Sequence, residues 1–371
     1  MRPSISPCTR IAALVIPLAA LFVRPASAQQ RWRLVEDLRI GGADTGAASF
    51  NDIRALAVDG KGQIFVLDLQ ALEIRVFDPR GRFVQRIGRN GEGPGEFRSP
   101  NGMLVAPDGK IWVNDIGQER MVVFDTRGKP ATHLRPPSWG FGGIWEATFD
   151  PQGRLLETLR SSRGSVVGRF DPKTARVDSL RMPDCLLMAD ARDWMSSYRT
   201  PTGGGGTFVV PFAPSTVFQL DGAGAIWCGS GSEYHIMAIE LGTGAIRFDQ
   251  TRKEAPAPIP AAARDSAIAF IRKLAERAPP GTIDVSRIPR TYPTVRALDL
   301  DDEGRVWAWV RRPGKAEIDV WSRTGTRLAT ITAPPVPDVG RIAQVRAGKL
   351  YLVQRDEDGV PFVVRYSLVK R

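Results

Sequence analysis

The sequence predicts an all-β fold, a six-bladed β-propeller made of four-stranded antiparallel blades. The first observation is a short pattern of glycine, any residue, an aliphatic residue and usually an aromatic residue. The pattern recurs six times, starting at Gly62, Gly109, Gly153, Gly224, Gly304 and Gly348. The second observation is the spacing, which is 47 residues from the first glycine to the second, and 44 both from the second to the third and from the fifth to the sixth. Repeats of that length with several short strands are typical of propeller blades.

Each repeat contains the turns and runs that a four-stranded meander needs. In the first repeat, the segment VDGKG at 58–62 supplies aspartate and glycine for a tight hairpin between two β-rich runs. A third run ends at the turn FDPRG of 77–81, and a fourth covers 83–87. The aromatic residues of the pattern are expected to pack between neighbouring blades; they are Phe65, Trp112, Trp227, Trp307 and Tyr351.

The sixth repeat lacks a fourth strand, because the chain ends at Arg371 after only three β-rich runs. The segment from Trp32 to Ile40 alternates in part between apolar and polar residues and precedes the first blade. We predict that it pairs into the last blade and closes the ring, which removes the open edges between the first and last blades.

The first 28 residues have the layout of a secretory signal peptide. Arg2 and Arg10 precede an apolar run over 11–23, and Ala26-Ser-Ala28 forms a small-residue cleavage site. The run is too short for a stable membrane-spanning helix. We therefore expect residues 1–28 to be removed and residues 29–371 to form a single exported domain, periplasmic or secreted, without a membrane span.

The charge and the cysteines restrict the partners only weakly. The net charge is +11, and removing three arginines with the signal peptide leaves 11 − 3 = +8. Because the arginines are scattered along the chain, we expect no nucleic-acid partner, and we expect a monomer. After loss of Cys8, Cys185 and Cys228 remain. Export permits a disulfide between them, and two buried thiols are the alternative.

The segment IGRNGEGPGEFRSP at 87–100 raises the question of a phosphate-binding loop. A dinucleotide loop needs a preceding strand and a following helix, and a P-loop needs Gly-Lys-Ser/Thr. Here Pro100-Asn-Gly102 leads into another strand, and the lysine motif is absent. We interpret the segment as a connector between two blades.

From Gly91 to Gly128 the sequence resembles an NHL repeat. The matching positions are Gly93, Pro94, Gly95 and Phe97, then Asn114-Asp115, then Phe124-Asp125 and Gly128. The match covers the first two blades well and fades in the third, fourth and sixth. The resemblance implies a six-bladed propeller of an exported bacterial protein. It does not fix the function, because the family includes binding scaffolds and some enzymes.

Two insertions interrupt the regular spacing, at about 183–213 and 253–293. Both lie between a fourth strand and the next first strand, so they are expected on one face of the ring. Four consecutive glycines, 203–206, suggest a mobile segment in the first insertion. In the second, between blades 4 and 5, the apolar residues of Ala261–Ala278 recur at helical spacing. This helix is either a lid over the channel or a cover for blade edges.

The face with the insertions carries the candidate ligand-binding residues. Aromatic side chains next to arginines suit an anionic or sugar-like ligand, although an ordinary polar rim would have a similar composition. The candidates are Arg98, Asn101, Trp145, Trp194, Tyr198 and Tyr292.

The sequence excludes some metal chemistry and leaves calcium open. Two histidines cannot form a three-histidine zinc site within one chain, and they make a Ser-His-Asp triad improbable. Calcium needs only oxygen ligands, which Asn51, Asp52, Asn101 and Asp115 would supply. Asp68 occupies the same repeat position as Asp115, which instead indicates a structural role.

Two functions follow from these observations. The first is an exported, non-catalytic propeller that needs no cofactor and binds a protein, peptide or glycan through the face with the insertions. The alternative is a calcium-dependent, lactonase-like hydrolase or lyase with its site at the channel mouth. Clustering of the four proposed calcium ligands around one point would favour the alternative.

Overall fold

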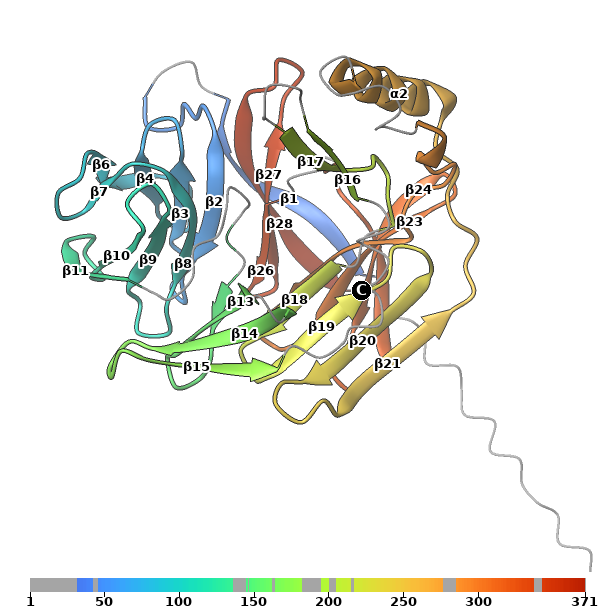
Figure 1. Cartoon of the computed structure of the whole chain (residues 1–371). Helices are drawn as coiled ribbons and strands as arrows, with labels where there is room; N and C mark the ends of the chain where they lie inside the picture. Colours follow the sequence, from blue (N-terminus) through green and yellow to red (C-terminus); the bar gives the residue numbers. More distant parts are fainter. Residues whose placement is uncertain are drawn as a thin grey trace, which may run out of the picture.

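The computed structural model describes residues 32–42, 46–135, 145, 147–161, 164–181, 195–199, 205–214, 217–275, 285–336 and 342–370. The expected signal peptide lies outside these ranges. The described residues form six four-stranded antiparallel sheets, which are the six blades of the predicted propeller (Figure 1).

Each of the first five blades uses four strands in chain order, from the axis outward. Blade 1 contains β2 (Ile53–Val58), β3 (Ile64–Asp68), β4 (Glu73–Phe77) and β5 (Phe83–Ile87). Blade 2 contains β8 (Pro100–Val105), β9 (Ile111–Asp115), β10 (Arg120–Phe124) and β11 (Pro130–Leu134). Blade 3 contains β12 (Ala147–Phe149), β13 (Leu155–Ser161), β14 (Gly164–Asp171) and β15 (Arg176–Arg181). Blade 4 contains β18 (Val217–Asp221), β19 (Ala225–Gly229), β20 (Tyr234–Glu240) and β21 (Ile246–Arg252). Blade 5 contains β22 (Val295–Leu300), β23 (Val306–Arg312), β24 (Lys315–Trp321) and β25 (Arg327–Thr332).

The sixth blade combines the two ends of the chain, as predicted. Its strands are β26 (Ala343–Arg346), β27 (Lys349–Arg355), β28 (Pro361–Lys370) and β1 (Trp32–Gly41). The outermost strand β1 pairs antiparallel with β28, from Trp32 opposite Lys370 to Gly41 opposite Phe362. The ring is therefore closed by backbone hydrogen bonds between the first and last described strands.

The aromatic residues of the repeat pattern pack between blades, which confirms their predicted role. Phe65, Trp112, Trp227, Trp307 and Tyr351 are all buried. One hydrophobic cluster, for example, joins side chains of blade 1 to side chains of blade 2. Each blade thus buries its faces against its neighbours.

The innermost strands line the axis and contact one another across blades. Strand β2 contacts β8 and β26, and β22 contacts β18 and β26. Blade 6 therefore lies between blades 1 and 5 at the axis. The connectors that enter these strands include both long insertions.

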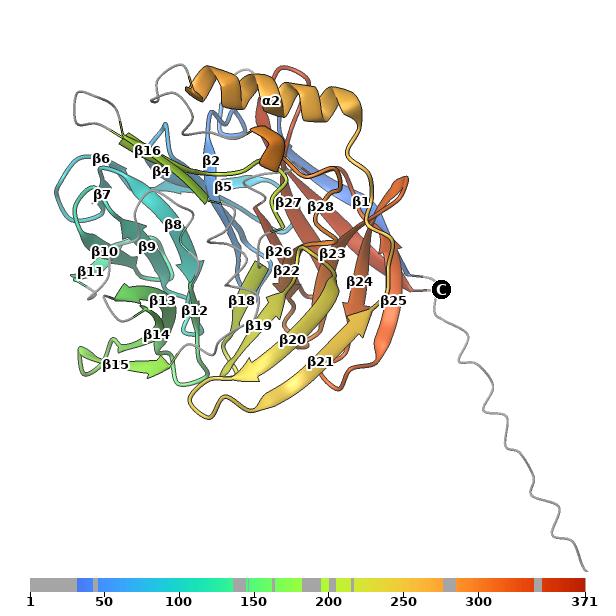
Figure 2. The same cartoon turned by 45° about the vertical axis from the view of Figure 1, so that its right-hand side comes forward.

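The insertions lie at the same end of the molecule in both views (Figures 1 and 2). The first contains a hairpin of β16 (Met195–Arg199) and β17 (Gly205–Val209), which the sequence did not predict. Two of the four consecutive glycines thus begin a strand. The second contains α2 (Ala261–Ala275) and the short 3₁₀ helix η1 (Val285–Arg287), so the predicted helix is confirmed up to Ala275.

The glycine-rich connector between blades 1 and 2 surrounds a carboxylate of the chain itself. Its two short strands, β6 (Arg89–Asn90) and β7 (Glu96–Phe97), pair in parallel. The Glu96 carboxylate accepts the Gly93 amide at 2.7 Å and is 2.7 Å from the Arg89 guanidinium. Gly91 has a φ of 148°, a backbone conformation that residues with a side chain rarely adopt, which favours glycine there. The loop forms a blade connector, as interpreted from the sequence.

Among the described residues, no helix combines the length and the apolar character needed to cross a bilayer.

Asp37 marks the closing seam, where a bulge interrupts the β1–β28 pairing between Glu36 and Leu38. Burial alone would raise the pKa of Asp37, but hydrogen bonds from Lys349, Ser367 and Arg365 outweigh burial and lower the pKa to about 2. A carboxyl whose pKa is depressed on folding stabilises the fold above its unfolded value of 3.8. That contribution is lost as the pH falls from about 4 through about 2.

We predict that Asp37→Asn lowers the melting temperature at pH 7 by a few degrees, corresponding to about 1 kcal/mol. The difference from wild type should shrink as the pH falls toward 2, which calorimetry across pH measures. Glu357→Gln, on the exposed β27–β28 turn, removes the same charge and should change little. A pH-independent difference for Asp37→Asn would contradict the role of the carboxylate.

Candidate functional site

The two insertions pack against each other through a small hydrophobic core. Val210 and Ala213 of the first insertion are buried together with Ala267, Ile271 and Ile288 of the second. We call this unit the cap: the β16–β17 hairpin with residues 210–214, and residues 257–275 and 285–292. The apolar face of α2 contributes Ala267 and Ile271 to this contact.

Backbone hydrogen bonds close the stem of the second insertion and join its end to blades 4 and 5. The Ile259 amide donates to the Arg290 carbonyl at 2.9 Å, and the Tyr292 amide donates to the Ala257 carbonyl at 2.8 Å. Thr294 then bridges the blades, because its amide donates to Gly231 and its carbonyl accepts from the Arg311 amide. The second insertion therefore leaves and re-enters the ring at a defined place.

Two aromatic rings and one guanidinium meet where the cap joins the ring. The Phe212 and Tyr292 ring centroids are 5.3 Å apart in an edge-to-face arrangement. The Arg311 guanidinium carbon lies 4.0 Å from the Tyr292 ring centroid. Phe212 also has a left-handed backbone with φ of 60°, which costs a bulky residue about 1–2 kcal/mol. Strain of this kind is often retained at binding sites, so we take Phe212, Tyr292 and Arg311 as the candidate site.

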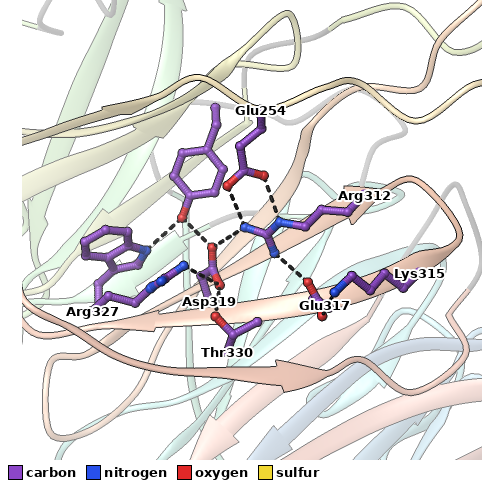
Figure 3. Close-up of polar contacts among 9 residues, drawn as sticks. Glu254, Arg312, Lys315, Glu317, Asp319, Arg327 and Thr330 are labelled. Carbon is purple, nitrogen blue, oxygen red and sulfur yellow. Dashed lines mark hydrogen bonds and ion pairs between the residues drawn. The ribbon is translucent and has the colours of Figure 1, made fainter. Parts of the chain in front are cut away.

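An ion-pair network beside this site anchors the second insertion (Figure 3). Arg312 donates to both oxygens of Glu254 at 2.8 Å, to Glu317 at 2.9 Å and to Asp319 at 2.7 Å. Burial opposes the charge of Arg312, but these carboxylates outweigh it and raise the pKa of the guanidinium further. Because Glu254 precedes the cap and the other residues belong to blade 5, the network holds the stem of the cap to the ring.

The same network reaches blade 4 through a buried tyrosine. The Tyr234 hydroxyl donates to Asp319 at 2.9 Å and accepts from the Trp321 indole at 2.9 Å. Thr330 donates to the other oxygen of Asp319 at 2.6 Å. Burial and the charge of Asp319 both raise the pKa of Tyr234, so the phenol stays protonated. The arrangement suits structural support and provides no proton carrier near neutral pH.

The structure separates the predicted ligand-binding residues. Trp145 is buried, and its indole donates to Glu157 at 2.9 Å. Asn101 is also buried and accepts from the Asn114 amide at 2.9 Å. The Arg98 side chain is 55% exposed and pairs with Glu92. Of the four candidates whose side chains the structure describes, only Tyr292 lies in the candidate site just described.

The other two candidates are not described as side chains. Trp194 lies outside the described residues, and only the backbone of Tyr198, in β16, lies within them. The sequence did not identify Phe212 as a site residue, because no local sequence pattern indicates its left-handed backbone conformation. It also missed Glu254, whose partner Arg312 is 58 residues away.

The proposed calcium ligands already have partners within the protein. The Asp115 carboxylate accepts the amides of Arg98 at 2.9 Å and Ser99 at 2.8 Å. The Asp68 carboxylate binds the amides of Asn51 and Asp52 in the same way. The two aspartates thus have the structural role that their shared repeat position indicates.

The side chain of Asp52 lies elsewhere, 3.7 Å from the Arg355 guanidinium. In the part of the chain that the structure describes, no group of three or more histidine, cysteine, aspartate or glutamate residues is arranged to hold a metal ion. The calcium set of Asn51, Asp52, Asn101 and Asp115 therefore stays a sequence-based hypothesis.

Cys228 is disulfide-bonded and lies in β19, within a buried cluster that joins blades 3 and 4. It is the one cysteine of the described residues. Cys185, its expected partner, lies outside them.

Comparisons with known proteins support the fold. Residues 48–137 match a protein family, DUF5128, described as a 6-bladed beta-propeller. No curated protein matches the sequence. A solved structure from Bacteroides fragilis, of a protein inferred to be exported, is similar at 14% identity and a TM-score of 0.52, over 91% of this chain and 96% of that one. At this identity the likeness shows the fold alone.

Two further solved structures resemble the chain less closely. Virginiamycin B lyase from Staphylococcus aureus has 13% identity and a TM-score of 0.48, over 91% of this chain and 100% of that one. A gluconolactonase from Xanthomonas campestris has 12% identity and a TM-score of 0.44, over 90% and 99%. These values carry no argument about activity.

We predict that calcium does not stabilise the ring through Asp115, because amides already occupy its carboxylate. Melting temperatures measured with calcium and with chelator should agree. A resident ion would add about 2.7 kcal/mol at a hundredfold excess over its dissociation constant. A drop of several degrees with chelator would contradict this prediction and revive the calcium hypothesis.

We predict that Ile271→Asp detaches the cap without unfolding the ring, because it places a charge in the small core between the insertions. Limited trypsin digestion should cut faster at Arg272 and Lys273, while the main melting transition persists. Phe270→Asp is the matched control, since Phe270 is 58% exposed on the same helix. Equal digestion of the two variants would show that the insertions do not depend on each other.

Proposed function

We propose that the chain is an exported, non-catalytic propeller that binds a protein, peptide or glycan where the cap meets the channel mouth. The observation that carries this proposal is the site formed by Phe212, Tyr292 and Arg311. These residues come from both insertions and from blade 5, and the cap core holds the insertions together. Tyrosine and arginine are among the residue types most enriched in binding hot spots.

Charge at this face favours a ligand with negative groups. Arg311 lies in the site, and Arg355 ends β27 with its side chain 50% exposed. The full chain carries +11, which becomes 11 − 3 = +8 without residues 1–28. An arginine stacked on an aromatic ring can still present its N–H groups edge-on to a carboxylate or phosphate. We accordingly favour an anionic protein, peptide or glycan over a neutral one.

The non-catalytic part of the proposal rests on the state of the titratable groups nearest the site. Glu254, Glu317 and Asp319 all pair with Arg312, and Tyr234 stays protonated. The histidines lie away from the axis, His133 on the outer strand β11 and His235 on β20. No contact of the described residues favours the calcium-dependent lactonase-like alternative.

Three further expectations belong to this proposal. The signal-peptide layout of residues 1–28 supports export to the periplasm or the exterior. The resemblance of the blade connector to an NHL-type repeat fits the position of Phe97, which is buried in the cluster that joins blades 1 and 2. The scattered arginines support a protein that does not bind nucleic acid, and a monomer stays an expectation.

We predict that replacing both Tyr292 and Arg311 by alanine weakens ligand capture at least tenfold, since hot-spot truncations cost about 2 kcal/mol or more. The mature protein would be immobilised and incubated with an envelope fraction of the producing cells. Bound proteins, peptides and released glycans would then be identified by mass spectrometry. The control is Arg80→Ala, which removes an exposed arginine from the β4–β5 turn.

A species retained by wild type and by Arg80→Ala but lost by the double variant is the expected result. Capture that is equal in all three proteins, or that depends on Arg80, would place the interaction elsewhere and overturn the proposal. Turnover of the captured species would contradict the non-catalytic assignment.

A further inference from the structure

Arg252 ends β21, the outer strand of blade 4, immediately before the stem of the cap. Its guanidinium carbon lies 4.8 Å from the ring centroid of Trp321 in blade 5 and 6.0 Å from that of Tyr234 in blade 4. Both aromatic residues are buried, whereas Arg252 is partly exposed. The guanidinium is therefore stacked on the edge of the interface between blades 4 and 5, with aromatic rings on one side and solvent on another.

The guanidinium of Arg252 has no polar partner in the described part of the chain, where its contacts are the two aromatic rings. Better-covered arginines pair with carboxylates, for example Arg75 with Glu73 at 2.7 Å and Arg305 with Asp301 at 2.6 Å. A guanidinium carries five N–H donors. The donors of Arg252 are therefore left for water or for an anion from outside the chain.

The carboxylates of this interface are already engaged (Figure 3). Glu254, two residues after Arg252, accepts from Arg312 with both oxygens at 2.8 Å. Asp319 accepts from Arg312 at 2.7 Å and from the Tyr234 hydroxyl at 2.9 Å. Arg252 could pair with either carboxylate only in competition with these contacts, so the chain does not neutralise it.

Arg327 brings a second guanidinium to the same edge from blade 5. It lies on the outer strand β25 opposite Trp321, so the two side chains share one face of the blade. Its Nη1 atom is 3.9 Å from Asp319, the longest ion pair in the network of Figure 3, and its side chain is 26% exposed. A short series of contacts then connects the two arginines: Arg252 stacks on Trp321, whose indole donates to Tyr234 at 2.9 Å, and Tyr234 donates to Asp319.

The charges of this interface do not cancel. Four positive side chains face three negative ones, which leaves 4 − 3 = +1; they are Arg252, Arg312, Lys315 and Arg327 against Glu254, Glu317 and Asp319. Lys253, exposed beside Arg252, adds another positive charge. Because aromatic rings replace water on one side of Arg252, its charge is screened less than a fully exposed charge would be. The interface therefore attracts an anion.

We propose that the edge of the interface between blades 4 and 5 binds an oxyanion, a carboxylate or a phosphate group, with Arg252 as its main contact and Arg327 beside it. A guanidinium stacked on an indole presents its N–H edge to two oxygens of one group, which suits both anions. This site is separate from the one formed by Phe212, Tyr292 and Arg311. It goes beyond the proposed function, and either proposal can hold without the other.

The test is isothermal titration of the mature protein with sodium phosphate and, separately, with sodium acetate, at an ionic strength kept constant with sodium chloride. At least one of the two anions should bind saturably to wild type. Binding of phosphate alone identifies a phosphate group as the ligand, and binding of acetate alone identifies a carboxylate. Arg252→Gln should weaken the binding at least tenfold, because it removes charge-assisted hydrogen bonds. Arg252→Lys keeps the charge but loses the two-oxygen contact, so it should also bind more weakly than wild type.

Arg86→Gln is the matched control. Arg86 also lies on an outer strand and stacks on an aromatic ring, with its guanidinium carbon 5.5 Å from the Phe83 centroid, but it already pairs with Glu73 at 3.2 Å. This variant should bind the anion like wild type. Arg252→Gln removes a side chain without a hydrogen-bonded partner among the described residues, so its melting temperature in chloride should change little. A loss of binding then reports the site and not the fold.

No saturable binding of either anion, or equal binding by wild type and Arg252→Gln, would overturn the inference. Binding that is lost when Tyr292 and Arg311 are replaced, but kept by Arg252→Gln, would place the anion at the cap and overturn it as well. The proposed function would stand in each of these cases if envelope capture still depended on Tyr292 and Arg311.

Discussion

The closing seam between β1 and β28 is the constraint on which the rest of the structure depends. Ten residues near the start of the folded chain supply the outer strand of the last blade. Without this pairing, blades 1 and 6 would expose their faces, and β26 would not be held between β2 and β22. The channel mouth exists only in the closed ring, so the site where the cap meets it depends on hydrogen bonds made at the outer edge.

Several carboxylates of the repeats accept hydrogen bonds from backbone amides. These carboxylates are therefore already occupied and are less suited to binding a metal or to catalysis. Asp68 and Asp115 bind the amides at the start of their blades, and Glu96 occupies the glycine-rich connector. The proposed function therefore relies on elements added to the repeat, which are the cap and its anchor at Arg312.

The repeat fold was predictable because turns and blade-packing aromatics are local signals with a fixed period. The closure by Trp32–Gly41 followed from counting strands, and α2 followed from its helical spacing. The site was less predictable, because its contacts join distant segments. Trp145 looked like a ligand contact and is buried against Glu157, whereas Phe212 gained its importance from a backbone conformation that the sequence does not reveal.

The central claim is that ligand binds at the capped end of the channel. Hydrogen–deuterium exchange of the mature protein with and without the species captured from the envelope fraction tests it most directly, because exchange reports position. The account predicts slower exchange in the cap and in β23 around Arg311, with no change in the turns at the opposite end of the blades. Protection confined to those turns, or no protection at all, would contradict it.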